Sequence, residues 1–126
     1  MTARILIVDD DPSMGETLAM FLNRRGFEAA SCTSARDALV LLDTHTFDSI
    51  VTDLNMDGMN GIALCERIGI LRPGLPVIVM TGFGTAEAKA SALGAGAYSF
   101  LTKPVDVHLL EATIDRAVRS RVLIDS

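Results

Sequence analysis

Four apolar runs of strand length are each followed by polar residues that could do chemistry. In chain order, the four groups are Asp9-Asp10-Asp11, Asp53, Thr81, and Thr102-Lys103. If these runs are parallel strands, their carboxyl ends lie at one sheet edge, where ligands bind in open α/β sheets. Clustered carboxylates repel one another, so such a site needs a cation, and an all-oxygen ligand set suits Mg²⁺. The Thr81 hydroxyl and the Lys103 ammonium would add a donor and a positive charge for phosphoryl oxygens.

The elements that must position these residues alternate between strand-length apolar runs and helical patterns. We expect strands at residues 5–8, 27–31, 49–52, 77–80 and 98–101, with 27–31 as a weaker edge strand. The expected helices begin after Asp11, Ser34, Gly61, Thr85 and Asp106. This alternation predicts βαβ units and a parallel sheet. The Ala-rich helix at 85–97 has little to bury, so we expect it to be the loosest.

Length and charge restrict the class of protein further. With 126 residues, the chain is expected to form one domain over 1–126. The net charge of −5 argues against a nucleic-acid surface, which needs phosphate-neutralising side chains. No apolar run approaches the roughly 18 residues that span a bilayer, and no signal peptide is readable. We therefore expect a cytoplasmic protein without membrane or direct nucleic-acid binding.

Five short motifs, in this order along the chain, resemble those of a known family. They are Ile7-Val8-Asp9-Asp10-Asp11, Thr52-Asp53-Leu54-Asn55-Met56, Gly61, Met80-Thr81-Gly82, and residues 94–104 ending in Thr102-Lys103-Pro104. Together they resemble the receiver domain of two-component response regulators, over essentially the whole chain. The resemblance implies a flavodoxin-like fold, a doubly wound five-stranded parallel sheet of order 2-1-3-4-5 with five helices. It also implies a signalling domain that catalyses only its own phosphotransfer and slow dephosphorylation.

The resemblance assigns the acidic residues to a phosphoacceptor site with a metal. Asp53 matches the phosphoacceptor, which attacks a phosphohistidine on a sensor kinase. Asp10 and Asp53 match direct Mg²⁺ ligands, together with the backbone carbonyl of Asn55. Asp9 matches the carboxylate that holds the metal through water. Mn²⁺ is expected to substitute for Mg²⁺.

The remaining matched positions stabilise the phosphoryl group or respond to it. Thr81 matches a hydroxyl that turns toward the phosphoryl group, and Lys103 matches an ammonium that bonds a phosphoryl oxygen. Phe100 occupies the aromatic switch position, and the Lys103–Pro104 bond matches a cis peptide. We expect the Thr81 side chain to be free to point away before phosphorylation, and Phe100 to fill the space that it vacates afterwards.

Two departures and a local likeness refine the resemblance. Asp57 stands where many relatives have proline, and the large Phe83 stands where side chains influence the access of water to the phosphate. The Thr81–Gly84 run and the segment before Lys103 look more like receivers of nitrogen-regulation activators than like chemotaxis receivers. The implied partners are a sensor histidine kinase or phosphotransfer protein, and either a second protomer or a downstream output domain.

Three other functions fit parts of the sequence. In a haloacid-dehalogenase-like phosphatase, Asp9 would be the nucleophile and Asp11 the general acid, but Asp53 would have no role. A pseudo-receiver would lack part of the chemical set, which is complete here. A flavodoxin-like cofactor binder would need a helix N-terminus free of the acidic cluster, because three aspartates repel a flavin phosphate.

Overall fold

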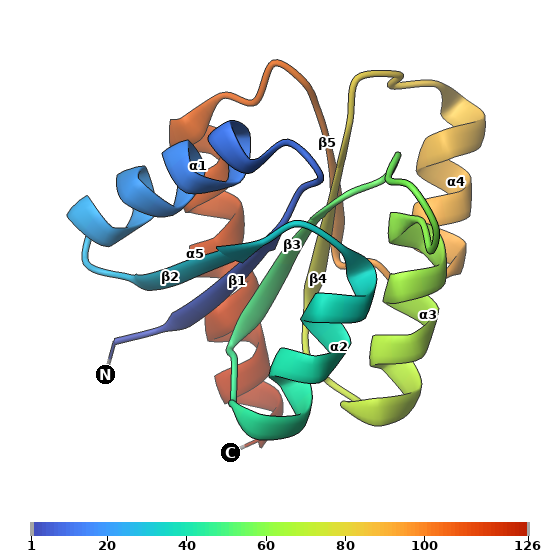
Figure 1. Cartoon of the computed structure of the whole chain (residues 1–126). Helices are drawn as coiled ribbons and strands as arrows, with labels where there is room; N and C mark the ends of the chain where they lie inside the picture. Colours follow the sequence, from blue (N-terminus) through green and yellow to red (C-terminus); the bar gives the residue numbers. More distant parts are fainter. Residues whose placement is uncertain (1, 126) are drawn as a thin grey trace.

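The computed structural model describes residues 2–125 and contains one parallel sheet of five strands. The strands are β1 (Arg4–Val8), β2 (Glu28–Cys32), β3 (Ser49–Asp53), β4 (Val77–Thr81) and β5 (Ser99–Thr102). Their order across the sheet is β2-β1-β3-β4-β5, which confirms the expected doubly wound, flavodoxin-like topology (Figure 1).

Five helices alternate with the strands and cover both faces of the sheet. They are α1 (Pro12–Arg24), α2 (Ala35–Thr44), α3 (Gly61–Leu71), α4 (Ala86–Gly94) and α5 (Val107–Asp125). The two core clusters place α1 and α5 on one face and α2, α3 and α4 on the other, as Figure 1 shows. Alternate residues of the central strands enter opposite clusters, so Leu6 and Val8 face α2 and α3 while Ile5 and Ile7 face α1 and α5. Continuous apolar runs are required for this arrangement, because each strand is covered on both faces.

Helix caps lie close to where the sequence predicts them. The Asp11 carboxylate accepts a hydrogen bond from the Ser13 N–H at 3.0 Å, with Pro12 as the first helical residue. The Ser34 hydroxyl accepts from the Asp37 N–H at 3.0 Å. These bonds satisfy N–H groups that have no partner within the helix, and they fix where α1 and α2 begin.

Helix α4 has the fewest buried residues of the five helices, as its composition predicts. Among its nine residues only Ala92 is buried. The helix ends at Gly94, earlier than the expected 97, because Gly96 adopts a left-handed φ of 99° that leads the chain into β5. Weak burial makes α4 the element that can shift at least cost.

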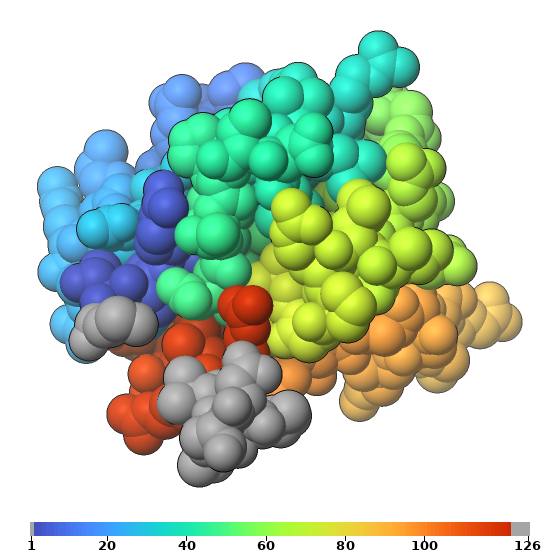
Figure 2. Space-filling model, turned by 90° about the horizontal axis from the view of Figure 1, so that it is seen from below, coloured from blue at the N-terminus to red at the C-terminus, as the bar shows by residue number. Residues whose placement is uncertain are grey.

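The end of the sheet opposite the strand C-termini is held by charged contacts. The Arg121 guanidinium donates to the Phe47 carbonyl at 3.1 Å, and the Arg4 N–H donates to the Asp48 carboxylate at 2.7 Å. Figure 2 views this end, where α5 in red reaches the green segment before β3. Within residues 2–125, no helix combines the length and apolarity needed to cross a membrane.

Candidate functional site

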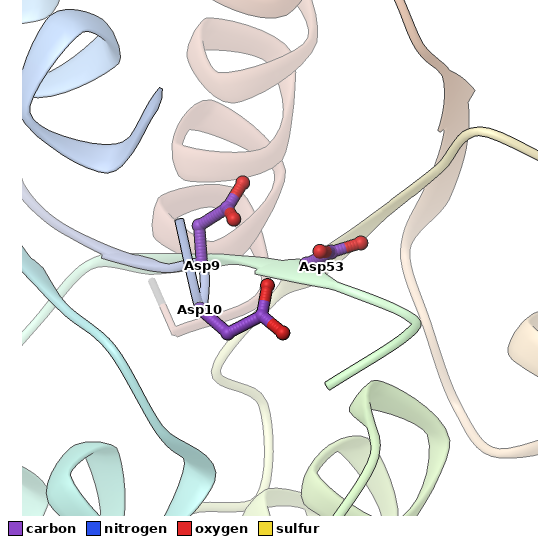
Figure 3. Close-up of side chains that lie close together, drawn as sticks. All are labelled: Asp9, Asp10 and Asp53. Atoms are coloured by element: carbon purple, nitrogen blue, oxygen red, sulfur yellow. The ribbon is translucent and has the colours of Figure 1, made fainter. Parts of the chain in front are cut away.

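The predicted acidic residues converge at the carboxyl edge of the sheet. Asp9 and Asp10 directly follow β1, and Asp53 is the last residue of β3. Oxygens from these three carboxylates lie within 4.8 Å of one another, and Figure 3 shows the side chains gathered at the two strand ends. Asp9 and Asp53 are buried, whereas Asp10 is exposed. The cluster is therefore open to solvent through Asp10.

Lys103 joins the cluster from the segment that follows β5. Its Nζ lies 3.1 Å from Asp9 Oδ2 and 3.3 Å from Asp53 Oδ2. Its backbone N–H donates to the Thr81 carbonyl at 2.7 Å, which extends the pairing of β4 with β5 by one residue. The Lys103–Pro104 peptide bond is cis. The single positive charge of Lys103 thus lies beside two negatively charged carboxylates, those of Asp9 and Asp53.

Burial and neighbouring charge shift the protonation equilibria of the site. Burial raises the pKa of the Asp53 carboxyl, and the charge of Asp9 adds to this rise, whereas Lys103 opposes it. Burial lowers the pKa of the Lys103 ammonium, but its bond to Asp9 and the charge of Asp53 outweigh that effect, so the pKa is raised. The ionised Asp53 carboxylate is therefore less stable in the folded protein than it would be in water.

The donor set fits a divalent cation. The three carboxylates are accompanied by a single ammonium, that of Lys103, so within the described residues this group has an excess of negative charge. All the candidate ligand atoms are oxygens, which suits Mg²⁺. Asp9 already accepts from the Asp11 N–H at 2.9 Å and from Lys103, so its oxygens are more occupied than those of the exposed Asp10.

Thr81 lies differently from our expectation. It is fully buried, and its hydroxyl accepts hydrogen bonds from the Asn55 side-chain amide at 3.2 Å and from the Phe83 N–H at 3.1 Å. The hydroxyl is held rather than free. From the sequence, only the backbone carbonyl of Asn55 was expected to take part in the site. The bond from its side chain was not predicted, because the spacing of residues 55 and 81 does not indicate which rotamers they adopt.

Phe100 is half-buried, and it packs against the core cluster on the α2–α3–α4 face of the sheet. Its strand partner is Val79, two residues before Thr81. Tyr98 precedes β5 and is 40% exposed, so it lies outside this core. Both residues that depart from the family pattern are exposed in loops, Asp57 in the loop after β3 and Phe83 in the loop after β4.

The fold and the site together define a flavodoxin-like α/β protein with a cluster of acidic side chains and one lysine at the strand C-termini. The chain belongs to the response regulator receiver domain family, whose model matches residues 5–115. The family assignment does not support the phosphatase interpretation, and Asp11, its proposed acid, caps α1 instead.

Two relatives of this chain are named as transcriptional regulators. The chain is 37% identical over 116 residues to the transcriptional regulatory protein GlrR of Escherichia coli K12, covering 92% of this chain and 26% of that protein. It is 38% identical over 112 residues to the DNA-binding transcriptional regulator NtrC of Klebsiella pneumoniae, covering 89% and 24%. The chain thus spans about a quarter of the length of these relatives.

Solved structures show the same fold. NtrX from Brucella abortus superposes with a TM-score of 0.93 at 31% identity, over 99% of this chain and 29% of that one. A receiver domain protein from Clostridium thermocellum gives 0.91 at 27% identity, over 97% and 98%.

The crowded carboxylates predict that Asp53→Asn stabilises the metal-free protein at neutral pH, because the amide carries no charge to be buried beside Asp9. Because the folded-state pKa of Asp53 is raised, wild type loses stability as pH rises from the unfolded pKa through the folded one, and the amide does not. The advantage should disappear below the unfolded pKa of aspartate, about 3.9. Thermal melts in EDTA across pH test this, and a variant that melts below wild type at pH 7 would contradict the crowded site.

Proposed function

We propose that this receiver domain takes a phosphoryl group from a phosphohistidine of a sensor kinase or phosphotransfer protein onto Asp53. The proposal is carried by one observation, the sharing of Lys103 Nζ between the buried carboxylates of Asp9 and Asp53. Lys103 offsets part of the cost of burying the ionised Asp53 carboxylate, and the three carboxylates still leave negative charge for a metal. The family assignment supports the same function.

The chemical step needs one nucleophile and charge stabilisation. An Asp53 carboxylate oxygen attacks phosphorus, a P–O bond forms, and the P–N bond breaks with its electron pair left on the imidazole nitrogen. Lys103, already 3.3 Å from Asp53 Oδ2, would neutralise a phosphoryl oxygen. The Thr81 hydroxyl, 0% exposed beside Asn55, would donate to another oxygen.

Mg²⁺, or Mn²⁺ in its place, would supply positive charge for the phosphoryl oxygens when bound. Asp10, Asp53 and the Asn55 backbone carbonyl would hold it directly, and Asp9 through water. The exposure of Asp10 supports its direct role, because its oxygens are accessible. The two bonds to Asp9, from Lys103 and from the Asp11 N–H, support a less direct one.

Residues 1–126 would form one receiver domain that regulates rather than turns over a substrate. The named relatives are bacterial transcriptional regulators, which supports a downstream output domain or protein and a cytoplasmic location. The phosphorelay would then end in a change of the surface formed by α4, β5 and α5, where an output partner or a second protomer would bind.

Intact mass spectrometry after incubation with acetyl phosphate tests the proposed function. The wild-type chain should gain a single phosphoryl group with Mg²⁺ or Mn²⁺, and none in EDTA. Equal labelling in EDTA would show that phosphorylation needs no divalent cation. Absence of labelling under every condition would reject phosphotransfer itself. Multiple turnover of a small phosphomonoester would instead favour a phosphatase.

Thr81→Ala should still accept phosphate but lose most of the conformational response. In wild type the hydroxyl would leave the Phe83 N–H and the Asn55 amide to donate to a phosphoryl oxygen, so the β4–α4 loop would follow it. Phe100 would then pack into the vacated space. The test is NMR with beryllofluoride, and chemical-shift changes near Phe100 should fall by more than about half in Thr81→Ala.

Thr81→Ser is the matched control for that experiment, because it keeps the hydroxyl and removes only the methyl group. It should respond as wild type does. If Thr81→Ala shows the full set of shift changes around Phe100, Thr81 is not the trigger.

A further inference from the structure

Strand β2 forms one edge of the sheet, and some of its backbone groups point away from the other strands. The Glu28 N–H and the Cys32 carbonyl are hydrogen-bonded to backbone groups that flank β1, so these two residues face β1. Because the direction of the backbone groups alternates along a strand, Ala30 also faces β1, whereas Ala29 and Ser31 face outward. Outward groups of this kind form a template on which another strand can pair.

A side chain occupies the outward groups of Ala29, and it belongs to Asn23 in the last turn of α1. The Ala29 N–H donates to Asn23 Oδ1 at 2.8 Å, and Asn23 Nδ2 donates to the Ala29 carbonyl at 3.0 Å. Figure 1 shows α1 passing along β2 at this edge of the sheet. An asparagine amide carries both a donor and an acceptor, so this one side chain makes the two bonds that a residue of a neighbouring strand would make.

The outward groups of Ser31 have no such cover. Within residues 2–125 the structure gives no hydrogen bond to the Ser31 N–H or to its carbonyl. Without the Asn23 side chain, β2 would therefore present two outward residues, Ala29 and Ser31, whose N–H and carbonyl groups all need a partner. Four such groups in a row are enough for a second strand to begin pairing.

A second copy of β2 is the strand that fits this edge. If two copies pair antiparallel about a twofold axis at Ala30, Ala29 of each copy lies opposite Ser31 of the other, and the two residues exchange both backbone bonds. The same register places Glu28 opposite Cys32, so the two glutamates do not face each other. The side chains at the axis are small, and none of them obstructs the approach.

We propose that the Asn23 side chain acts as a strand surrogate that closes the β2 edge and keeps two copies of this chain from pairing through it. The residues that carry this inference lie outside the proposed phosphoryl site, so it does not depend on the proposed function. Its readout is the association of the chain and not the labelling of Asp53.

Sedimentation velocity over a series of protein concentrations tests the inference. Asn23→Ala removes both bonds to Ala29, so its weight-average mass should rise above that of wild type toward that of a dimer. At low concentration, NMR should also show the Ala29 N–H exchanging with solvent about tenfold faster than in wild type, which corresponds to the loss of one hydrogen bond.

Thr44→Ala is the matched control, because it also removes a neutral polar side chain from the last turn of a helix. The Thr44 hydroxyl is hydrogen-bonded only to residues 40, 41 and 45, and it makes no bond to β2. This variant should sediment as wild type does, and its Ala29 N–H should exchange at the wild-type rate.

A thiol at the expected twofold axis locates the contact between the two copies. Opposing Cα atoms of an antiparallel pair without mutual hydrogen bonds lie about 4.5 Å apart, which is within the reach of a disulfide. With a mild oxidant, the double variant Asn23→Ala/Ala30→Cys should therefore form a covalent dimer, whereas Ala30→Cys alone should not. Asn23→Ala without the added thiol reports any cross-link through Cys32.

A mass of Asn23→Ala equal to that of wild type at every concentration would overturn the inference. It would do so even if the Ala29 N–H exchanged faster, because the two bonds would then hold only the turn after α1. Association without the cross-link at Ala30→Cys would place the contact elsewhere and would also overturn it. If Asn23→Ala does not fold, Asn23→Ser takes its place with the same expected results, since its shorter side chain cannot reach both groups of Ala29.

Discussion

Asp53→Asn is expected to reduce phosphoryl incorporation from acetyl phosphate to below about 1% of the wild-type level, because the nucleophilic carboxylate is lost. The amide keeps the shape of the side chain at the end of β3, so the fold should survive. Lys103 would still be able to pair with Asp9, which lies 3.1 Å away. Intact mass measured with Mg²⁺ present gives the labelled fraction directly.

Asp57→Asn is the matched control, since it changes another aspartate of the same region to its amide. Asp57 is exposed in the loop after β3. Its variant should be labelled as wild type is. Undiminished labelling of Asp53→Asn, or loss of labelling only in Asp57→Asn, would place the phosphoacceptor elsewhere.

The arrangement of the sheet could be predicted because its central strands are apolar on both faces. Every residue of β3 and β4 is buried, so residues 49–52 and 77–80 read as continuous apolar or small-residue runs without helical periodicity. Once the strands were parallel, the polar residues after them had to meet at one edge. The convergence of Asp9 and Asp53 follows from this topology alone.

The hydrogen-bond partners of polar side chains could not be predicted in the same way. The bond from the Asn55 amide to Thr81 depends on two side-chain rotamers and on the path of the β3–α3 loop. The two bonds that join the Asn23 side chain to Ala29 depend on how the turn after α1 brings the end of the helix beside β2. Neither property has a periodicity or a spacing that a sequence displays, because both arise from tertiary packing.

Strand and helix ends were also less predictable than their centres. The third strand extends to Asp53 rather than stopping at Thr52, because the Asp53–Met80 pair continues the ladder. Asp53, the proposed nucleophile, is therefore held by the sheet itself. A strand-end position gives Asp53 a fixed backbone, whereas Asn55, two residues later, lies in a loop.

The loop after β3 returns to the sheet at Gly61, the first residue of α3. Gly61 donates its N–H to the Leu54 carbonyl at 2.9 Å. A Cβ atom at this position would overlap the Asp53 carbonyl oxygen and would lie 2.9 Å from Leu54 Cα. Both neighbours are backbone atoms, which unlike a flexible side chain have little freedom to move. Glycine is therefore required for the helix to begin this close to Asp53.

Gly61→Ala is accordingly expected to destabilise the fold by about 2 kcal/mol, within the range for inserting a methyl group where there is no space. Because the displaced atoms belong to Asp53 and Leu54, labelling of Asp53 should also fall, even at temperatures where the variant is folded. Gly69→Ala in the same helix is the control: nothing lies within 4 Å of its new Cβ, so it should gain about 0.5–1 kcal/mol from helix propensity. If the close approach at Gly61 matters, urea denaturation should show a lower free energy of unfolding for Gly61→Ala than for wild type, and a higher one for Gly69→Ala. Equal stabilisation by both alanines would show that the loop can relax and that glycine at 61 is not needed.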